Sequence, residues 1–584
     1  MRKRIAPIAI FLAAAVSFAV ATRGQTKPAA PGTEYLVTTG EAGRAGGRLV
    51  VSLRAEPKTL NPVTATDNPS KEVIWRLMAD LVHINRFSQR TEPALAKSWK
   101  VSSDGLRYTL KLRRGLRFSD GHPVSADDVL FSFQVYLDEK VHAPQRDLLI
   151  VGGKPVGIRK LDADTVVFEL SQPYGVGERL FDGFAILPRH LLESAYNEGK
   201  LTQSWGLNTA PEQIAGLGPF RLKEYVAGQR LVLERNPYYW KADQKETALP
   251  YLSELVFLFV PSEDAQVIRF QAGETDVISR VNAQNFAVLA GQQQARGYAM
   301  QDIGPGLEYN FLFFNLNDLS GKSLPQLARK QAWFRDVKFR QAVSAAIDRD
   351  SIVRLVYQGR ATPLWGNVTP GNKLWGNASL PHPQRSLDRA RSLLQAAGFS
   401  WKGDGALVDS GGQAVEFTIV SNSSNAERMK MATIIQDDLK QLGMRVQIVA
   451  LEFRALLARL FDSKDYEACV LGLGSGDADP NADMNVWLSS GPQHLWNPGQ
   501  TQPATPWEAD LDRLMKQQLV AQKAAERKKL YDRVQQIVAE NQPMVFLVSP
   551  NVLVGAKNGL GNFHPAILDH YTLWNVEELF WRGK

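Results

Sequence analysis

The sequence predicts an α/β fold, and three observations support this class. Strand, helix and strand patterns follow one another between Val415 and Ile448. A hairpin pattern leads into a capped helix between Val101 and Phe133. The 584 residues, 44% hydrophobic and 22% charged, exceed one ordinary hydrophobic core and have the balance of a globular protein. We therefore expect two or three α/β lobes.

The first 21 residues have the pattern of an export signal. Three basic residues at 2–4 precede an apolar run over 5–21 that ends in the small residues a signal peptidase accepts. An uncleaved anchor is the alternative, but the run is short beside the roughly 20 apolar residues of a spanning helix. We expect cleavage near Thr22, a flexible leader over 22–45 and a periplasmic mature protein.

The charge and cysteine content exclude several classes. Three of the eight excess positive charges lie in the signal, and there is no long basic run, so we expect a solvated surface and no nucleic-acid partner. Cys469 is the single cysteine, which excludes an intrachain disulfide. Its apolar surroundings predict a buried core thiol.

The first elements of the folded body can be placed from turn and strand signals. Arg48–Leu53 reads as a strand, and Glu56–Pro62 as a turn-rich loop. A turn at 103–105 precedes alternating residues over 108–112, which predicts a hairpin. Ser125 then caps a helix whose first turn carries two aspartates beside its positive end.

The later elements follow the same logic. The turn at 218–219 and the alternation over 220–233 predict a second hairpin, and apolar residues over 339–347 have helical spacing. A strand at 415–419, a helix at 431–442 and a further strand form a right-handed parallel unit. The loop at 421–425 lacks a glycine fingerprint, so no nucleotide cofactor is expected.

Three of these segments, Val101–Phe131, Gly216–Trp240 and Phe334–Ile352, resemble the family 5 extracellular solute-binding proteins, the dipeptide, oligopeptide and nickel receptors of bacterial ABC importers. The resemblance extends from about Gly47 to Trp581. It implies a periplasmic binding protein type II-like fold, in which two α/β lobes joined by a hinge trap the ligand and an extra lobe is inserted.

The resemblance also implies how the chain is divided. Lobe I would be discontinuous, lobe II would be the insert, and lobe III would form the other side of the cleft. The implied ranges are 46–85, 213–306 and 546–584 for lobe I, 86–212 for lobe II and 307–545 for lobe III.

The segment Gly472–Leu488 is the main candidate for ligand binding, because it follows a strand and is acidic. In peptide-binding relatives, an aspartate just before the acidic-proline step holds the α-ammonium of the ligand. Here that position is Gly476, with Asp477 one residue later and Asp479 before the proline. Asp477 is the predicted partner of the ammonium and Asp479 a further predicted ligand-binding residue, and the departure keeps other ligands open.

Loop aromatics and one asparagine complete the predicted site. Flat rings in loops rich in Gly, Asn and Pro give contact area at little entropic cost, although core packing is the ordinary role of each. The predicted residues are Tyr309, Asn310, Trp365, Trp375, Trp487 and Trp496.

No metal, cofactor or catalytic residue is predicted. The acidic segment alternates like a calcium loop, but Ala482 stands where glycine is needed and Leu488 where a bidentate glutamate is needed. The eight histidines have no close i, i+4 pair. No nucleophile elbow is present, which leaves a cryptic hydrolase as a remote alternative.

The sequence therefore predicts a monomeric periplasmic receptor that binds a short peptide and delivers it to an ABC permease without chemical change. A nickel complex, an oligosaccharide or another polar solute is the alternative ligand. A sensor that presents its ligand to a membrane partner would share the same motifs.

Overall fold

The computed structural model describes residues 32–317, 324–474 and 477–583. The predicted signal peptide at 1–21 and the first part of the predicted leader lie outside these residues. Among the described helices, none is both long enough and apolar enough to cross a membrane.

The described part of the leader packs on the folded body. β1 (Leu36–Val37) pairs in parallel with β13 (Lys241–Ala242), and Glu34 forms an ion pair of 2.7 Å with Lys97. Leu36 is partly buried against the hydrophobic core. The sequence predicts a flexible leader over 22–45, whereas residues 32–45 follow a fixed path because they gain these contacts.

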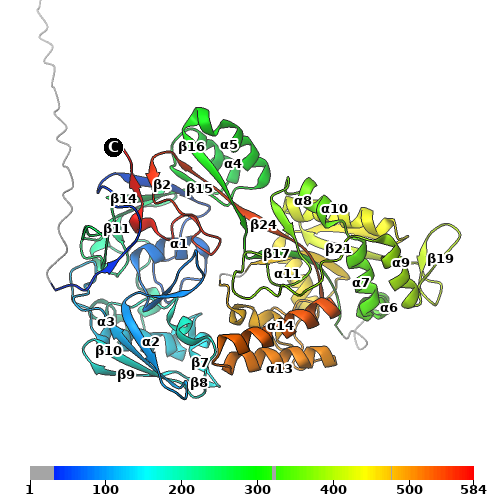
Figure 1. Ribbon diagram of the computed structural model, residues 1–584, viewed down its shortest axis with the longest axis horizontal. Coiled ribbons are helices and arrows are strands. Elements are labelled where there is room, and N and C mark those ends of the chain that lie inside the picture. The colour runs from blue at the N-terminus through cyan, green and yellow to red at the C-terminus, as the bar shows by residue number, and fades with distance from the viewer. Residues whose placement is uncertain (1–31, 318–323, 475–476, 584) are drawn as a thin grey trace, which may run out of the picture.

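One large mixed sheet runs through the segments expected to form lobes I and III, and β24 (Met544–Lys557) joins its two halves (Figure 1). We use the lobe names below for the residue ranges given above. The C-terminal part of β24 pairs with β15 and β16, and its N-terminal part pairs with β17 and β18. The strand order is β11 (Phe220–Val226), β12 (Arg230–Arg235), β14 (Glu254–Phe259), β2 (Arg48–Leu53), β15 (Val277–Ser279), β24, β17 (Glu308–Phe314), β23 (Ala468–Gly474), β21 (Glu416–Asn422) and β22 (Arg445–Leu451), with β16 (Tyr298–Pro305) and β18 (Ala361–Pro363) beside β24.

Lobe II has its own antiparallel sheet. The predicted hairpin forms β5 (Ala96–Val101) and β6 (Arg107–Leu112), followed by β10 (Thr165–Glu169) and β9 (Gly157–Asp162). The predicted helix is α2 (Ala126–Leu137), and the predicted Ser125 cap is confirmed; Asp128 completes a capping box with it. Smaller elements of lobe II are β4 (Thr91–Pro93), the pair β7 (Ile150–Val151) and β8 (Lys154–Pro155), and α3 (Arg189–Asn197). β4 pairs with β3 (Val82–Ile84) of lobe I.

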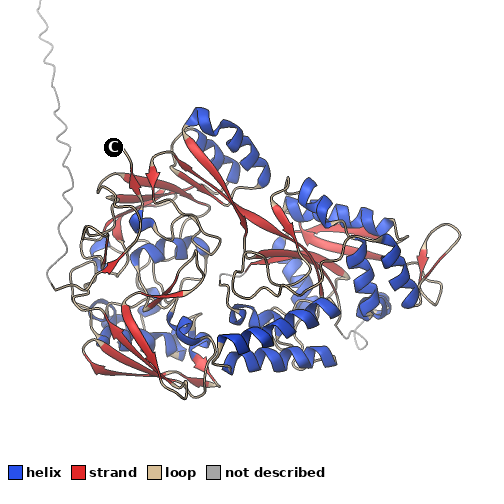
Figure 2. Ribbon diagram, in the orientation of Figure 1, coloured by secondary structure: helices blue, strands red, loops and turns tan. Residues whose placement is uncertain are grey.

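Helices cover the sheet in both large lobes (Figure 2). The predicted strand–helix–strand unit is confirmed, since β21 and β22 are parallel and α10 packs on both. The helices of lobe I are α1 (Asn68–Leu77), α4 (Glu263–Gln271) and α5 (Ala283–Arg296). Those of lobe III are α6 (Pro325–Arg335), α7 (Val337–Ala346), α8 (Arg349–Leu355), α9 (Leu387–Ala396), α10 (Ala426–Lys440), α11 (Phe453–Leu457), α12 (Met484–Trp487), α13 (Pro506–Val520) and α14 (Ala524–Asn541).

Strand β17 shows how the lobe III core is organised. Leu312 and Phe314 pack into the cluster beneath α7 and α10, whereas Phe311 and Phe313 pack into the cluster on the other face, beside α13 and α14. This follows from the two-residue period of a strand, which sends successive side chains to opposite faces. From Phe311 to Phe314 the strand is therefore apolar on both faces, and it serves as core for both layers of lobe III.

Candidate functional site

A cavity of about 420 Å³ lies where lobe I meets lobe II and the Asp477 loop of lobe III. Lobe I lines it with the end of β2 and the following Arg54, with one side of α1 and with the C-terminal segment 569–573. Lobe II contributes Tyr136 and Asp182. This volume falls within the roughly 300 to 1,000 Å³ of pockets that hold small solutes. The cavity is therefore the candidate ligand site.

The cavity wall carries both signs of charge and several aromatic rings. Arg280 lies over the ring of Tyr571 at 5.4 Å. Although burial raises the pKa of Glu72, Arg76 and His570 bring it down to about 2. Such a wall suits a polar solute with charges of both signs. The charged residues are Arg54, Lys71, Arg86, Arg280, Glu72, Asp182, Asp477 and Asp569, and the aromatic ones are Trp75, Tyr136, Phe257 and Tyr571.

Asp477 is held from across the cleft by Arg179, which lies on η3 (Gly177–Phe181) of lobe II. The Nε of Arg179 donates to Oδ2 of Asp477 over 3.3 Å, and its Nη2 pairs with Oδ1. The Nη1 donates to the Gln89 carbonyl over 3.0 Å. Burial lowers the pKa of Arg179, but the carboxylates of Asp477 and Asp479 raise it above its ordinary value. The Asp477 carboxylate is thus already compensated by a cation.

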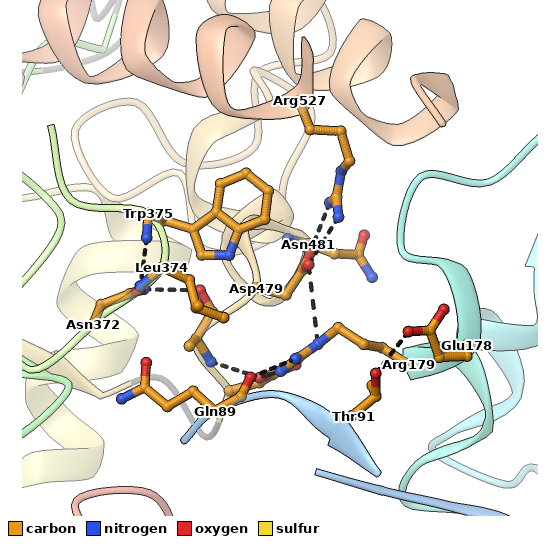
Figure 3. A network of polar contacts seen from close by, with 12 residues as sticks. Gln89, Thr91, Glu178, Arg179, Asn372, Leu374, Trp375, Asp479, Asn481 and Arg527 are labelled. Atoms are coloured by element: carbon orange, nitrogen blue, oxygen red, sulfur yellow. Dashed lines mark hydrogen bonds and ion pairs between the residues drawn. The ribbon is translucent and has the colours of Figure 1, made fainter. Parts of the chain in front are cut away.

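Asp479 has a second arginine as its partner (Figure 3). Both carboxylate oxygens accept from Arg527 of α14 over 2.9 Å, and Nε of Arg179 lies 4.0 Å away. Arg527 also donates to the Gln518 carbonyl over 3.1 Å, and its guanidinium lies over the Trp375 ring at 4.9 Å. The side chains of Asp479 and Arg527 are only 3% and 5% exposed. This pair fixes the loop from within lobe III.

Further hydrogen bonds tie lobe II to lobe III beside these arginines. Gln89 donates to the Gly371 carbonyl over 2.7 Å and accepts from the Lys373 amide over 2.9 Å. Asn481 donates to the Tyr174 hydroxyl over 3.1 Å. We call the contacts of Gln89 and Arg179 with lobe III the latch. The latch closes one side of the cleft.

The structure brings some of the predicted site residues together and buries others. Asp477 lines the cavity, and Asp479 and Trp375 meet at Arg527. Trp487 and Trp496 contact each other at 5.9 Å in the lobe III core and are fully buried. Trp365 stacks on His382 at 4.6 Å, and Tyr309 and Asn310 are buried on β17. The cavity therefore takes only Asp477 from the predicted set.

Two buried polar atoms on β17 lie within the core of lobe III. The Oη of Tyr309 and Nδ2 of Asn310 have no hydrogen-bond partner among the described residues. Burial, and then the Asp483 carboxylate, raises the pKa of Tyr309. The pKa of Asp483 is itself raised to about 7 by burial and by Asp477 and Asp479. Asp477, Asp479 and Asp483 thus lie close together in this loop. Asp477 forms an ion pair with Arg179 and Asp479 with Arg527.

Sequence reasoning missed the cations that define the site. Arg86, Arg179 and Arg527 lie in segments with no ligand motif, and charged residues on helices and loops are usually solvated. Asp569 stands in the C-terminal segment, far from the acidic loop in the chain. No local signal identifies these four residues, because only the folded chain gathers them.

Comparisons with known proteins agree with this architecture. The family model of the bacterial extracellular solute-binding proteins, family 5 Middle, matches residues 90–494. The oligopeptide-binding protein AppA of Bacillus subtilis is 28% identical over 560 residues, covering 92% of each chain. A probable ABC transporter-binding protein of Deinococcus radiodurans is 28% identical over 518 residues, covering 85% of each chain. The solved structure of AppA with a nonapeptide superposes with a TM-score of 0.68 at 25% identity, covering 92% of this chain and 100% of that one.

Proposed function

The chain belongs to the bacterial extracellular solute-binding proteins of family 5, and from this membership we propose that it captures a short peptide between its lobes and delivers it to the permease of an ABC importer. Relatives named for oligopeptide and dipeptide binding support a peptide as the solute class. The observation that carries the proposal is the cavity between the lobes, whose wall has four cations and four anions.

A peptide would use both signs of charge in that wall. Its carboxylate fits beside Arg86 or Lys71, since neither forms an ion pair with another described residue. Its ammonium fits Asp569, which is exposed on the same wall, or Asp477 once Arg179 releases it. Charge-assisted hydrogen bonds at both ends would offset the cost of desolvating the two charges.

A solute without a free ammonium is the second candidate, and the latch favours it. Arg179 already neutralises Asp477, so this aspartate has little remaining negative charge to offer a ligand. Gly476 stands at the position where peptide-binding relatives carry the acidic residue. Rings such as Trp75 and Tyr571 would then supply contact area for a sugar or a chelate.

Delivery would depend on lobe movement about the strands that cross between lobes I and III. The chain crosses from β16 to β17 and again within β24. Rotation about such crossings is a hinge motion, which opens and closes the cleft with little change inside each lobe. A permease that binds only the closed form would thereby distinguish the solute-bound receptor from the empty one.

Export, location and oligomeric state complete the proposal. The basic start and apolar run at 1–21 support export and cleavage near Thr22, so that the mature protein works in the periplasm as a monomer. The chain would bind its solute without changing it chemically. Some charged groups of the cavity wall already form ion pairs within the protein, and the others suit the recognition of a charged solute.

Thermal unfolding with a panel of solutes tests the proposal. Di- to pentapeptides, oligosaccharides and chelated nickel are compared, because a ligand at about 100 times its dissociation constant adds roughly 2.7 kcal/mol of stability. A rise with peptides alone supports peptide capture. A rise with another class alone keeps the receptor and replaces the ligand, and no rise with any class contradicts the proposal.

A matched pair of variants separates ligand binding from the latch. If Asp477 holds the peptide ammonium, Asp477→Asn weakens binding by about 2 to 5 kcal/mol, whereas Arg179→Gln leaves the carboxylate free and does not weaken it. If Asp477 serves only the latch, both variants change the affinity equally. N-acetylated peptides give the complementary control, because they lack the ammonium.

A further inference from the structure

Three side chains that ligate metals converge between the candidate ligand cavity and a smaller neighbouring cavity. Asp80 follows α1, His83 lies in β3 and Asp182 follows η3 of lobe II. One ligand atom from each lies within 4.8 Å of the other two. The sequence predicts no metal site because Asp182 is remote in the chain from the other two residues.

Backbone amides position the two carboxylates, and neither carboxylate forms an ion pair with a described residue. Asp80 Oδ2 accepts from the Gly183 amide over 3.3 Å, and Asp182 Oδ1 accepts from the Ile84 amide over 3.0 Å. One oxygen of each carboxylate therefore remains for another partner. Among the described residues, no Lys, Arg or His nitrogen lies within 4.0 Å of either carboxylate. Adjacent buried carboxylates repel each other and are costly to desolvate unless a cation joins them.

The cluster is accessible from both cavities. Asp182 lines the cavity of about 420 Å³, whereas Asp80 and His83 line the neighbouring cavity of about 100 Å³. Arg86 lines both cavities and places a cation on their shared wall. An ion that enters the cleft can thus reach the three side chains without unfolding the lobe.

We propose that Asp80, His83 and Asp182 bind one divalent transition-metal ion, such as Zn²⁺, at the boundary of the two cavities. An imidazole with two carboxylates favours zinc or nickel over magnesium and calcium, which prefer oxygen ligands alone. Two donors at the usual ~2.1 Å from a tetrahedral zinc lie ~3.4 Å apart. The three ligand atoms lie within 4.8 Å of one another, so the side chains need to close by at most about 1.4 Å.

Three protein ligands leave a coordination position open. Because Asp182 lines the larger cavity, a solute bound there would lie beside the metal ion. A carboxylate or amine of a bound solute, or a water molecule, would complete the coordination. The inference goes beyond solute capture, and it is tested on the protein without any solute, so its failure does not bear on the proposed function.

Isothermal titration of the chelator-treated, tag-free protein with Zn²⁺ tests the site. We expect one ion per chain, with affinity lowered at least about tenfold in Asp182→Asn and in His83→Gln, since even the loss of an outer-shell partner costs that much. Asparagine keeps the acceptor for the Ile84 amide, so metal-free Asp182→Asn is expected to unfold at a temperature no lower than the parent protein. Co²⁺ reports the ligands independently through its visible absorption, which His83→Gln should weaken.

A surface pair on lobe II provides the matched control. His190 contacts Asp120 at 2.6 Å and stacks on His122 at 3.8 Å, so it too can attract metal ions. His190→Gln removes an imidazole there and should leave the affinity unchanged. Absence of binding at micromolar Zn²⁺, or binding that persists in Asp182→Asn and His83→Gln and disappears in His190→Gln, would overturn the proposal.

Discussion

Replacing Arg527 by methionine tests the pair that fixes the acidic loop. The substitution keeps an apolar stem over Trp375 but removes two hydrogen bonds of 2.9 Å to Asp479 and leaves that carboxylate buried. Removing one partner of a buried ion pair costs about 3 to 5 kcal/mol, because the remaining charge is uncompensated. In a lobe of roughly 240 residues, each kcal/mol lowers the unfolding temperature by about 2 to 4 °C. We expect a fall of about 10 °C, measured by scanning calorimetry.

The double variant Asp479→Asn, Arg527→Met identifies the cause of that loss. Asparagine keeps the acceptor that caps the Asn481 amide but carries no charge, so part of the stability should return. The two single substitutions together should therefore destabilise the protein by about 1 to 3 kcal/mol more than the double variant does. Two results would refute the assignment of a buried, uncompensated charge. One is a loss of under about 1 kcal/mol in the free energy of unfolding of Arg527→Met. The other is a loss in the double variant equal to the sum of the losses in the two single variants.

Three other outcomes follow from the same loop and its surroundings. Arg179→Gln should enlarge the solute-free protein in small-angle scattering, because it breaks the latch; an unchanged radius of gyration contradicts this. The pKa of Asp483 is raised to about 7, so its protonated form favours the folded state, and its contribution to stability is lost as pH rises from about 4 to about 7. Asp483→Asn should flatten that dependence in thermal unfolding between pH 4 and pH 8, and an equal slope in both proteins would exclude Asp483 as its source. Burial raises the pKa of Cys469, so a thiol reagent should label it only after denaturation, and rapid labelling of the native protein would show that the thiol is accessible.

Local patterns predicted much of the fold. The hairpin of β5 and β6, the capped α2 and the parallel pair β21 and β22 depend on neighbouring residues, and all three form as expected. The apolar spacing around α7 was predicted, but the chain breaks there into α6, α7 and α8. Asp336 caps α7 and Asp348 caps α8, which ends each preceding helix.

The site was predicted less well, for a physical reason. Arg179 and Asp477 are 298 positions apart, and their pairing depends on how lobe II lies against lobe III. Trp487 and Trp496 stand in loop-like sequence, yet both are fully buried, because α12 and the loop that follows it pack over one face of β17, where large apolar side chains fill the space. A tryptophan between glycines and asparagines is therefore compatible with either role until the packing is known.

The latch bears on the energy that a solute must supply for closure. The Asp477 side chain is 32% exposed and that of Arg179 is 10% exposed, so water screens their attraction to about 1 kcal/mol or slightly more. A free energy of about 1 kcal/mol shifts the equilibrium between the open and the closed form by about fivefold. Converting a mostly open population into a mostly closed one needs a shift of roughly 10⁴-fold. The solute must therefore contribute most of the closing free energy through contacts with both lobes. A solute that also displaced Arg179 from Asp477 would lose the latch term, and this favours ligands that use Asp569 and the cavity cations while leaving the latch intact.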